Sequence, residues 1–187
     1  NWSADAPMIS TNTVPLTDET VELQGTADLE QLAQDQIAQL ILSRLKGHGL
    51  ARLVEAILRA QGYSTYRSEE GPDGGIDILA GSGQLGFGET RLCVQVKSQD
   101  TPVEAKTLNE LRGAMTSVNA NQGLLVSWSG YKGSVQKLIA SSFFSVRLWT
   151  QKELLDALFT HYDQLDEELK AELPLKRIWT VAIQDLD

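Results

Sequence analysis

The stretch GPDGGIDILAGSGQLGFGETRLCVQVKS, residues 71–98, decides the fold. It holds two short apolar runs, at 76–80 and 91–98, and a glycine-rich segment lies between them. Short apolar runs bounded by glycine are typical of β-strands, and two strands joined by a short loop most often pair antiparallel. The sequence therefore predicts a β-hairpin over this stretch.

One carboxylate, Asp77, stands inside the first of these runs. A charge in a half-buried strand is costly unless it is paired or coordinates a metal. In the second run, strand alternation sends Cys93, Gln95 and Lys97 to one face and the residues between them to the other. Asp77 meets Gln95 and Lys97 only if the register pairs odd-numbered residues with odd-numbered ones, because a one-residue shift reverses its face. The glycine-rich loop leaves both registers open.

The odd register would assemble a carboxylate, an amide oxygen, a backbone carbonyl and an ammonium group at one rim of a sheet. Oxygen ligands of this kind suit Mg²⁺, which binds through one or two carboxylates and completes its shell with water and substrate phosphate. Lys97 cannot ligate while protonated, but it can orient a nucleophilic hydroxide beside the metal. Glu55, in LVEAIL, is a further candidate ligand or water-holding group. The predicted chemistry is phosphodiester hydrolysis. The competing interpretation is a structural ion pair between Asp77 and Lys97.

Around the hairpin, helical and strand patterns alternate. Helices are predicted from Asp28, in DLEQLAQDQIAQLILSRLKG, and in GLARLVEAILRAQGY, followed by a strand at STYRS. After the hairpin come a helix in VEAKTLNELRGAMTSV, a strand in GLLVSW, a helix in SVQKLIASSFF, a strand in VRLW, and a long helix from about Gln151. The predicted fold is α/β, a mixed sheet flanked by helices. Its core order is helix, three strands, helix, strand, helix, strand, with an extra N-terminal helix and a long C-terminal one.

Composition indicates one domain with an extension. Residues 1–27 are polar, lack periodicity and are interpreted as a linker or the tail of an upstream domain, and residues 28–187 as the domain itself. The net charge of −9 argues at first against a nucleic-acid partner, but residues 51–150 carry ten basic and nine acidic groups, so the acidity lies on the flanks. A single cysteine and the lack of a long apolar run predict a reduced, cytoplasmic protein with no membrane role.

The motif GPDGGIDILA followed by CVQVK resembles the catalytic core of Mrr-type restriction endonucleases, a branch of the PD-(D/E)xK nuclease superfamily in which glutamine replaces the usual acidic residue. GHGLARLVEAILRAQGY is similar to the family's leading helix, and GLLVSWSGY and VRLW to its later strands, so the resemblance covers about residues 47–160. It implies a restriction-endonuclease-like fold, with Asp77 as metal-binding carboxylate and Gln95 and the Val96 carbonyl completing the metal site. Lys97 would then be the catalytic lysine and Glu55 the helix glutamate.

The resemblance implies a Mg²⁺-dependent DNA endonuclease, with Mn²⁺ as a substitute cation. It would be the type IV-like cleavage domain of a restriction or anti-phage defence protein, acting on foreign or modified DNA. It also implies a recognition or sensor domain upstream. Two alternatives stay open, namely a catalytically weak nucleic-acid-binding module on the same fold, motivated by the neutral Gln95, and a repair or junction-resolving nuclease.

A single metal site activates one water against one phosphate, so cutting both strands needs two copies or two successive events. The sequence therefore predicts a weak homodimer. Two segments are candidate contact surfaces, the stripe of Leu165, Leu169 and Leu173 and the segment LPLKRIWTVA, residues 173–182. The alternative is that both segments fold back onto their own domain.

Overall fold

The computed structural model describes residues 18–69 and 75–179, with side chains from residue 29 onward. The chain divides into two units. The larger one, Gln36–Lys176, holds the sheet and every predicted site residue, and the smaller one consists of Asn1–Asp35 and Arg177–Asp187. The predicted linker lies outside the described residues up to residue 17.

The described residues form a five-stranded mixed sheet of order β1-β2-β3-β4-β5. The antiparallel half consists of β1 (Ser64–Arg67), β2 (Ile78–Gly81) and β3 (Arg91–Lys97). The parallel half adds β4 (Gln122–Ser127) and β5 (Val146–Trp149) to β3. The predicted mixed sheet and its order of elements are confirmed.

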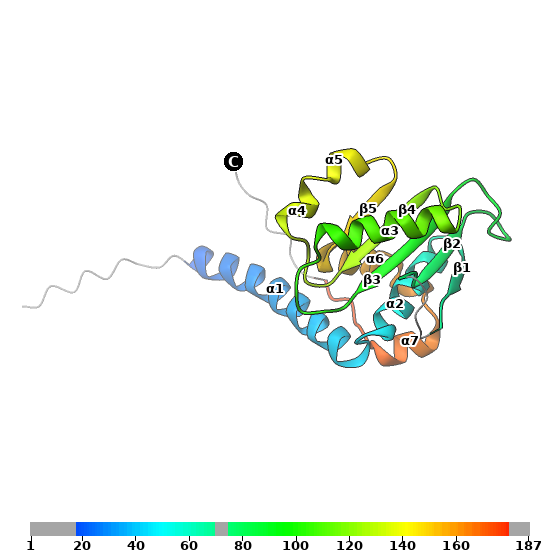
Figure 1. Ribbon diagram of the computed structural model, residues 1–187. Helices are drawn as coiled ribbons and strands as arrows, with labels where there is room; N and C mark the ends of the chain where they lie inside the picture. The colour runs from blue at the N-terminus through cyan, green and yellow to red at the C-terminus, as the bar shows by residue number, and fades with distance from the viewer. Residues whose placement is uncertain (1–17, 70–74, 180–187) are drawn as a thin grey trace, which may run out of the picture. The chain divides into compact units, whose positions relative to one another are not determined.

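Helices cover both faces of this sheet (Figure 1). α2 (His48–Ala60), α6 (Gln151–His161) and α7 (Glu167–Glu172) belong to one face, and α3 (Ala105–Ser117) to the other, together with the short helices α4 (Gly133–Gln136) and α5 (Ile139–Ser142). Helices on both faces are what parallel connections between β3, β4 and β5 require.

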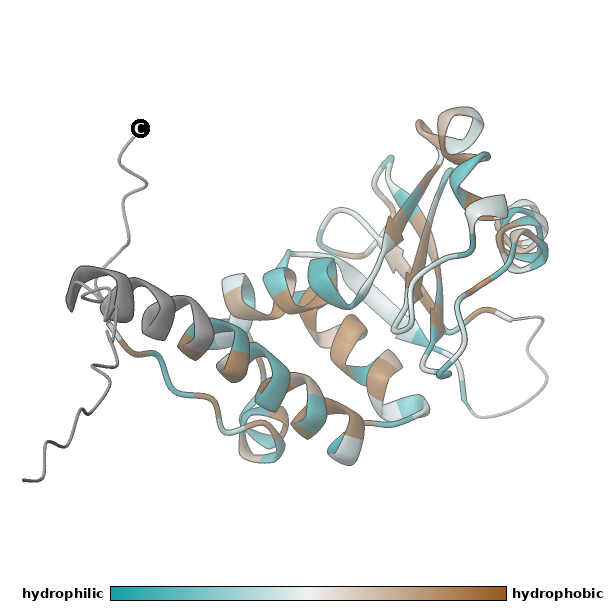
Figure 2. Cartoon of the chain, turned by 90° about the vertical axis from the view of Figure 1, so that its left-hand side faces the viewer, coloured by the Kyte–Doolittle hydropathy of each residue, from teal (hydrophilic) through white to brown (hydrophobic). Residues whose placement is uncertain are grey.

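Two apolar cores result from strand alternation. On the α2 and α6 side, Ile78, Val94 and Leu124 pack with the helices, and on the α3 side Cys93 and Leu125 pack with Leu108 and Leu111. Apolar residues are accordingly concentrated on the strands and on the helix sides that face them (Figure 2). Cys93 and the other odd-numbered residues of β3 thus point to the α3 side, a face that the sequence did not identify.

The β2–β3 loop closes tightly on itself. A Cβ atom on Gly81 would lie 2.0 Å from the Gly86 carbonyl oxygen, so the two backbones approach more closely than any side chain allows. The Ser82 amide donates to the Thr90 carbonyl at 3.0 Å, and the Gly88 amide donates to the Ser82 carbonyl at 2.7 Å. This loop sets a register in which Ile78 pairs with Val94 and Leu79 with Cys93.

Three helices differ from the prediction. α1 runs from Asp18 to Arg44 and so begins ten residues before Asp28. The helix predicted over SVQKLIASSFF is broken into α4 and α5. The Ser141 and Ser142 hydroxyls both donate to the Leu138 carbonyl, and such bonds compete with the helical backbone pattern.

The predicted long C-terminal helix is wrong in its length. α6 ends at His161, a 3₁₀ turn follows at Tyr162–Gln164, and the chain is extended at Leu165 and Asp166 before α7 begins. The Asp166 carboxylate accepts a hydrogen bond from the Leu169 amide at 2.7 Å, which caps a new helix instead of continuing the old one.

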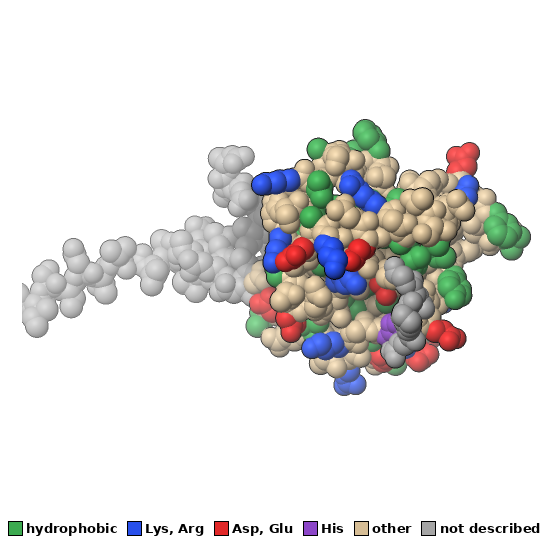
Figure 3. Space-filling view, viewed as in Figure 1, with side chains coloured by type: hydrophobic (Ala, Val, Ile, Leu, Met, Phe, Trp, Pro, Cys, Tyr) green, Lys and Arg blue, Asp and Glu red, His purple; other side chains and the backbone are tan. Residues whose placement is uncertain are grey.

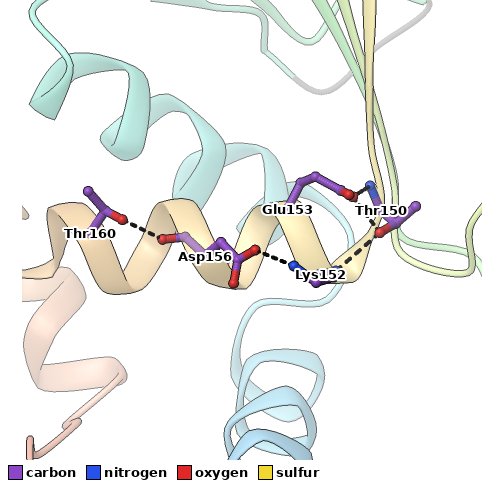
Figure 4. Close-up of polar contacts among 5 residues, drawn as sticks. All are labelled: Thr150, Lys152, Glu153, Asp156 and Thr160. Atoms are coloured by element: carbon purple, nitrogen blue, oxygen red, sulfur yellow. Dashed lines mark hydrogen bonds and ion pairs between the residues drawn. The ribbon is translucent and has the colours of Figure 1, made fainter. Parts of the chain in front are cut away.

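The start of α6 carries a capping box (Figure 4). The Thr150 hydroxyl accepts a hydrogen bond from the Lys152 amide at 3.2 Å, while the Glu153 carboxylate accepts from the Thr150 amide at 2.7 Å. Reciprocal capping of this kind satisfies amides that have no partner within the helix. It fixes the turn by which β5 enters α6.

The leucine stripe proposed as a contact surface is part of the core. Leu165, Leu169 and Leu173 are at most 4% exposed and pack in the cluster beneath α2 and α6. The alternative, that this stripe folds onto its own domain, is therefore confirmed. In the segment 173–182, Ile178 and Trp179 are exposed, and residues 180–182 lie outside the described part. None of the described helices has the length and apolar character needed to cross a membrane.

Candidate active site

Asp77 lies at the point where the pairing of β2 with β3 begins. Each pair in this ladder joins odd with odd or even with even residues, and its first pair is Ile78 with Val94. Just before it, the Asp77 amide donates to the Val94 carbonyl at 2.9 Å, which is one residue out of step with the ladder and marks a β-bulge at Asp77. The odd register that the sequence left open is the one that forms.

The Asp77 carboxylate is oriented by the backbone of β3. Its Oδ2 atom accepts a hydrogen bond from the Val96 amide at 2.6 Å. In an extended strand the N–H and C=O groups of one residue point to the same edge, so the Val96 carbonyl is directed toward Asp77 as well. A half-buried carboxylate and a backbone carbonyl are thus neighbours at the point where β2 begins.

Gln95 carries the clearest sign of a ligand. Its side chain is 2% exposed, and its Oε1 atom is buried with no hydrogen-bond partner among the described residues. A buried acceptor without a partner costs roughly 1–3 kcal/mol, and a bound cation would remove that cost. An Asp77–Lys97 ion pair would leave this oxygen unused, so the donor set favours a cation site over a structural pair.

Lys97 ends β3 on the same face as Gln95 and is half-buried. It pairs in register with Ser127 of β4, a fully buried serine whose hydroxyl donates to the Gly130 carbonyl at 2.7 Å. Sequence reasoning missed Ser127, although a polar residue that ends the apolar run GLLV could have signalled it. Lys97 therefore has a fully buried serine as its neighbour on β4.

The segment that begins at Lys97 is hydrogen-bonded to the loop after β4. The Trp128 amide donates to the Lys97 carbonyl at 2.9 Å, and Val103 forms a parallel bridge with Tyr131. The Tyr131 hydroxyl contacts the carbonyls of Leu125 and Trp149 at 2.5 and 2.8 Å. These contacts hold the carboxyl ends of β3, β4 and β5 as one rigid edge.

Cys93 shares the face of Gln95 but is a core residue. Burial, with a contribution from the negative charge of Asp77, raises the pKa of its thiol to about 11. A thiol with that pKa is almost entirely protonated at neutral pH and is a poor nucleophile.

Glu55 is bound by side chains of α2 and β1. It is 4% exposed on α2, the helix that covers the face of Ile78. Its Oε1 atom accepts from Arg59 at 2.7 Å and from Thr65 at 2.9 Å, and its Oε2 atom contacts Arg67 at 3.1 Å. The structure thus places Gln95, Val96 and Lys97 on β3 with the Asp77 carboxylate bonded to the Val96 amide, and it pairs Glu55 with two arginines.

The oxygen atoms available at this site suit a hard cation that has few charged ligands. Within residues 18–69 and 75–179, no group of three His, Cys, Asp or Glu side chains could hold a metal ion. One carboxylate, one amide oxygen and one carbonyl are instead available, and Mg²⁺ accepts such ligands together with water and phosphate. Acidic and basic side chains are interspersed on the face drawn in Figure 3. On that face, attraction of a phosphate depends on individual cations rather than on a continuous basic surface.

Comparison with known proteins bears on this arrangement. The family model Mrr_cat, described as "Restriction endonuclease", matches residues 42–158. The chain is similar to the solved structure of the DNA modification-dependent restriction endonuclease AspBHI, with a TM-score of 0.58 and 18% identity over 75% of this chain and 38% of that one. It is also similar to the MspJI restriction endonuclease in complex with a 27-mer oligonucleotide, with a TM-score of 0.43 and 16% identity over 92% and 40% of the two chains.

The chain thus spans about 38–40% of the length of these two solved chains. No curated protein sequence matches the chain significantly. At 18% identity the likeness to AspBHI shows a shared fold, a mixed sheet with helices on both sides, and the family match covers every residue of the candidate site.

Proposed function

The chain belongs to the Mrr-type restriction endonuclease family, and from that premise we propose that it is a Mg²⁺-dependent DNA endonuclease domain that hydrolyses phosphodiester bonds. The single observation that carries the metal dependence is the buried Gln95 Oε1 atom, which has no partner among the described residues and belongs to the residue before Val96, whose amide binds Asp77.

In this proposal Asp77, Gln95 and the Val96 carbonyl hold the cation. The hydrogen bond from the Val96 amide keeps the Asp77 carboxylate turned toward β3 and favours its charged form. When bound, Mg²⁺ lowers the pKa of a coordinated water and neutralises charge on the phosphate. Mn²⁺, which also favours oxygen ligands, should substitute for it.

Lys97 is the catalytic cation of the proposed site. Its position two residues beyond Gln95 on the same face directs the ammonium toward the rim where the scissile phosphate would lie. There it can orient the attacking water and stabilise negative charge that develops on the phosphate oxygens.

Glu55 acts in the proposal as a positioning residue rather than as a ligand. Both its oxygens are engaged by Arg59, Thr65 and Arg67, and Arg67 ends β1 directly beside Ile78. The Ser68 amide donates to the Asp77 carbonyl at 3.0 Å, so the segment that Glu55 anchors is bonded to the segment that carries Asp77.

The proposal extends to the biological role of the domain. We propose foreign or modified DNA as substrate, because the similar solved chain AspBHI is described as modification-dependent, and a type IV-like role in restriction or anti-phage defence in the cytoplasm. A recognition or sensor domain elsewhere in the protein would supply specificity, since the proposal assigns Asp77, Gln95 and Lys97 to the cation and the phosphate.

Plasmid cleavage tests the chemistry. In Mg²⁺, Asp77→Asn and Lys97→Ala should each lower the cleavage rate at least about 100-fold, since one removes the ligand charge and the other the catalytic cation. Lys137→Ala, which removes an exposed lysine between α4 and α5, should cut like the wild type. Wild-type rates in either site variant would show that the assigned chemistry is wrong.

The second candidate function is a nucleic-acid-binding module without activity, which the neutral Gln95 favours because an amide attracts a cation less than a carboxylate does. Calorimetry separates the two functions. Mn²⁺ binding that is lost in Asp77→Asn supports the nuclease, and tight DNA binding with no dependence on metal supports the module. A junction-resolving or repair nuclease would share the chemistry and would prefer branched over linear DNA.

A further inference from the structure

Gly75 touches the side chain that would bind the metal. A Cβ atom at this position would lie 2.7 Å from the Gln95 Nε2 atom and 3.7 Å from its Cδ atom. A non-bonded carbon and nitrogen cannot approach to 2.7 Å, so any residue other than glycine would displace the amide or the backbone. Gly75 also has a φ angle of +82°, a conformation that glycine adopts without steric cost.

The contact bears on which end of the Gln95 amide faces the site. The Nε2 end lies against the bare backbone of Gly75, and the Oε1 end is the buried acceptor that has no partner among the described residues. Only the oxygen of an amide can ligate a cation, because the NH₂ group is a donor. An amide displaced by a side chain at position 75 would therefore move its oxygen from the place that it now has.

We propose that Gly75 is a positioning residue that acts through Gln95. The missing side chain at position 75 gives the Gln95 amide its place against the backbone of Gly75 and keeps Oε1 available as a ligand. This inference rests on the proposed function, because it assumes that Gln95 contacts a cation. It adds that the glycine before the strand is required for ligand orientation, and not only for the turn.

The first experiment compares alanine substitutions at two glycines that have similar positive φ angles. Gly75→Ala should weaken Mn²⁺ binding about tenfold by calorimetry on the whole chain, which is the scale on which groups that orient a ligand affect metal affinity. Gly62→Ala is the matched control. Gly62 has a φ of +91°, and a Cβ atom added there would have no neighbouring atom within 4 Å, so this variant carries the same backbone strain without the contact. Its Mn²⁺ affinity should equal that of the wild type.

A double-mutant cycle then tests whether Gly75 acts through Gln95. In a Gln95→Ala background there is no amide to displace, so adding Gly75→Ala should change Mn²⁺ affinity less than twofold. A tenfold effect in both backgrounds would mean that Gly75 acts on the site by another route, and it would overturn the inference. An unchanged affinity in the single variant Gly75→Ala would overturn it as well.

Folding is measured in parallel by circular dichroism and thermal unfolding in EDTA. If Gly75→Ala loses its native structure where Gly62→Ala keeps it, the double variant Gly75→Ala with Gln95→Ala decides. Recovery of the fold supports the contact with Gln95, and no recovery overturns it. Failure of the proposed function looks different, because wild type and Asp77→Asn would then bind Mn²⁺ equally or not at all.

Discussion

The carboxylates of Glu55 and Asp77 differ in the groups that donate hydrogen bonds to them. Glu55 is satisfied by side chains, with a guanidinium on each oxygen and the Thr65 hydroxyl on one of them. Asp77 receives a hydrogen bond from the Val96 amide of β3, and the preceding residue, Gln95, holds a buried amide oxygen that has no partner among the described residues. A carboxylate already engaged on both oxygens stabilises structure, whereas one beside an unsatisfied acceptor suits a cation.

Glu55→Ala tests this contrast at the level of the residue. We expect the free energy of unfolding to fall by about 1–2 kcal/mol, because charged hydrogen bonds are lost while Arg59, 61% exposed, regains water. Mn²⁺ affinity by calorimetry should stay within about twofold of wild type. Glu110→Ala, at a half-exposed helix glutamate paired with Lys106, is the control for both measurements. A tenfold loss of Mn²⁺ affinity in Glu55→Ala would restore Glu55 as a metal ligand.

The sequence predicted that Gln95 and Lys97 share one face of their strand, because strand alternation is a local property with a period of two residues. It left the register that relates them to Asp77 open, because the glycine-rich loop between the strands does not determine it. It could not predict which face of the sheet α2 covers, since that depends on how distant elements pack. For this reason the sequence did not predict that Glu55 is bound by Arg59, Thr65 and Arg67.

At the level of elements, apolar periodicity predicted the strands and most helix starts, but not where two helices break. The helix that was expected to continue from Gln151 stops because Asp166 caps α7 and directs Leu169 and Leu173 into the core. An acidic residue inside a helical pattern is equally compatible with a solvated position and with a cap. Here Asp166 acts as a cap, because the leucines that follow it pack in the core.

The capping box of α6 yields a prediction that depends on pH. Burial would raise the pKa of Glu153, but hydrogen bonds from the Thr150 hydroxyl and amide outweigh burial and hold it below its ordinary value of 4.5. The carboxylate therefore contributes stability that is fully present above about pH 4.5 and is lost as the pH falls through the lower folded-state pKa. Thr150→Ala removes the hydroxyl and should lower the free energy of unfolding by about 1 kcal/mol at pH 7.

Urea unfolding at pH 7 and pH 3 measures this effect. The destabilisation caused by Thr150→Ala should shrink at pH 3, where Glu153 is increasingly protonated in both proteins. Thr160→Ala is the control on the same helix, because its hydroxyl donates to the Asp156 carbonyl and does not contact Glu153 (Figure 4). Equal destabilisation by Thr150→Ala at both pH values would contradict the proposed coupling.

For the whole molecule, one proposed metal site per chain limits what a single copy can do. We expect a weak homodimer with two-fold symmetry, and we expect nicked plasmid to appear before linear plasmid. The leucines 165, 169 and 173 are buried within one chain and are not available as the contact, so exposed Ile178 and Trp179 are the remaining candidates from the predicted surfaces. Sedimentation over a concentration series, run beside plasmid time courses, checks the expectation. A strict monomer that linearises plasmid without a nicked intermediate would refute it.

The hairpin has a consequence for the order in which the molecule folds. Asp77, Gln95 and Lys97 lie within about twenty residues of one another, on two strands joined by the tight loop at Gly81 and Gly86. Hairpins form in about 1–10 μs, whereas the parallel pairing of β3 with β4 and β5 must first close longer loops. The side chains proposed for catalysis can therefore come together early on the folding pathway, and the rest of the chain is added around a site whose geometry is already set.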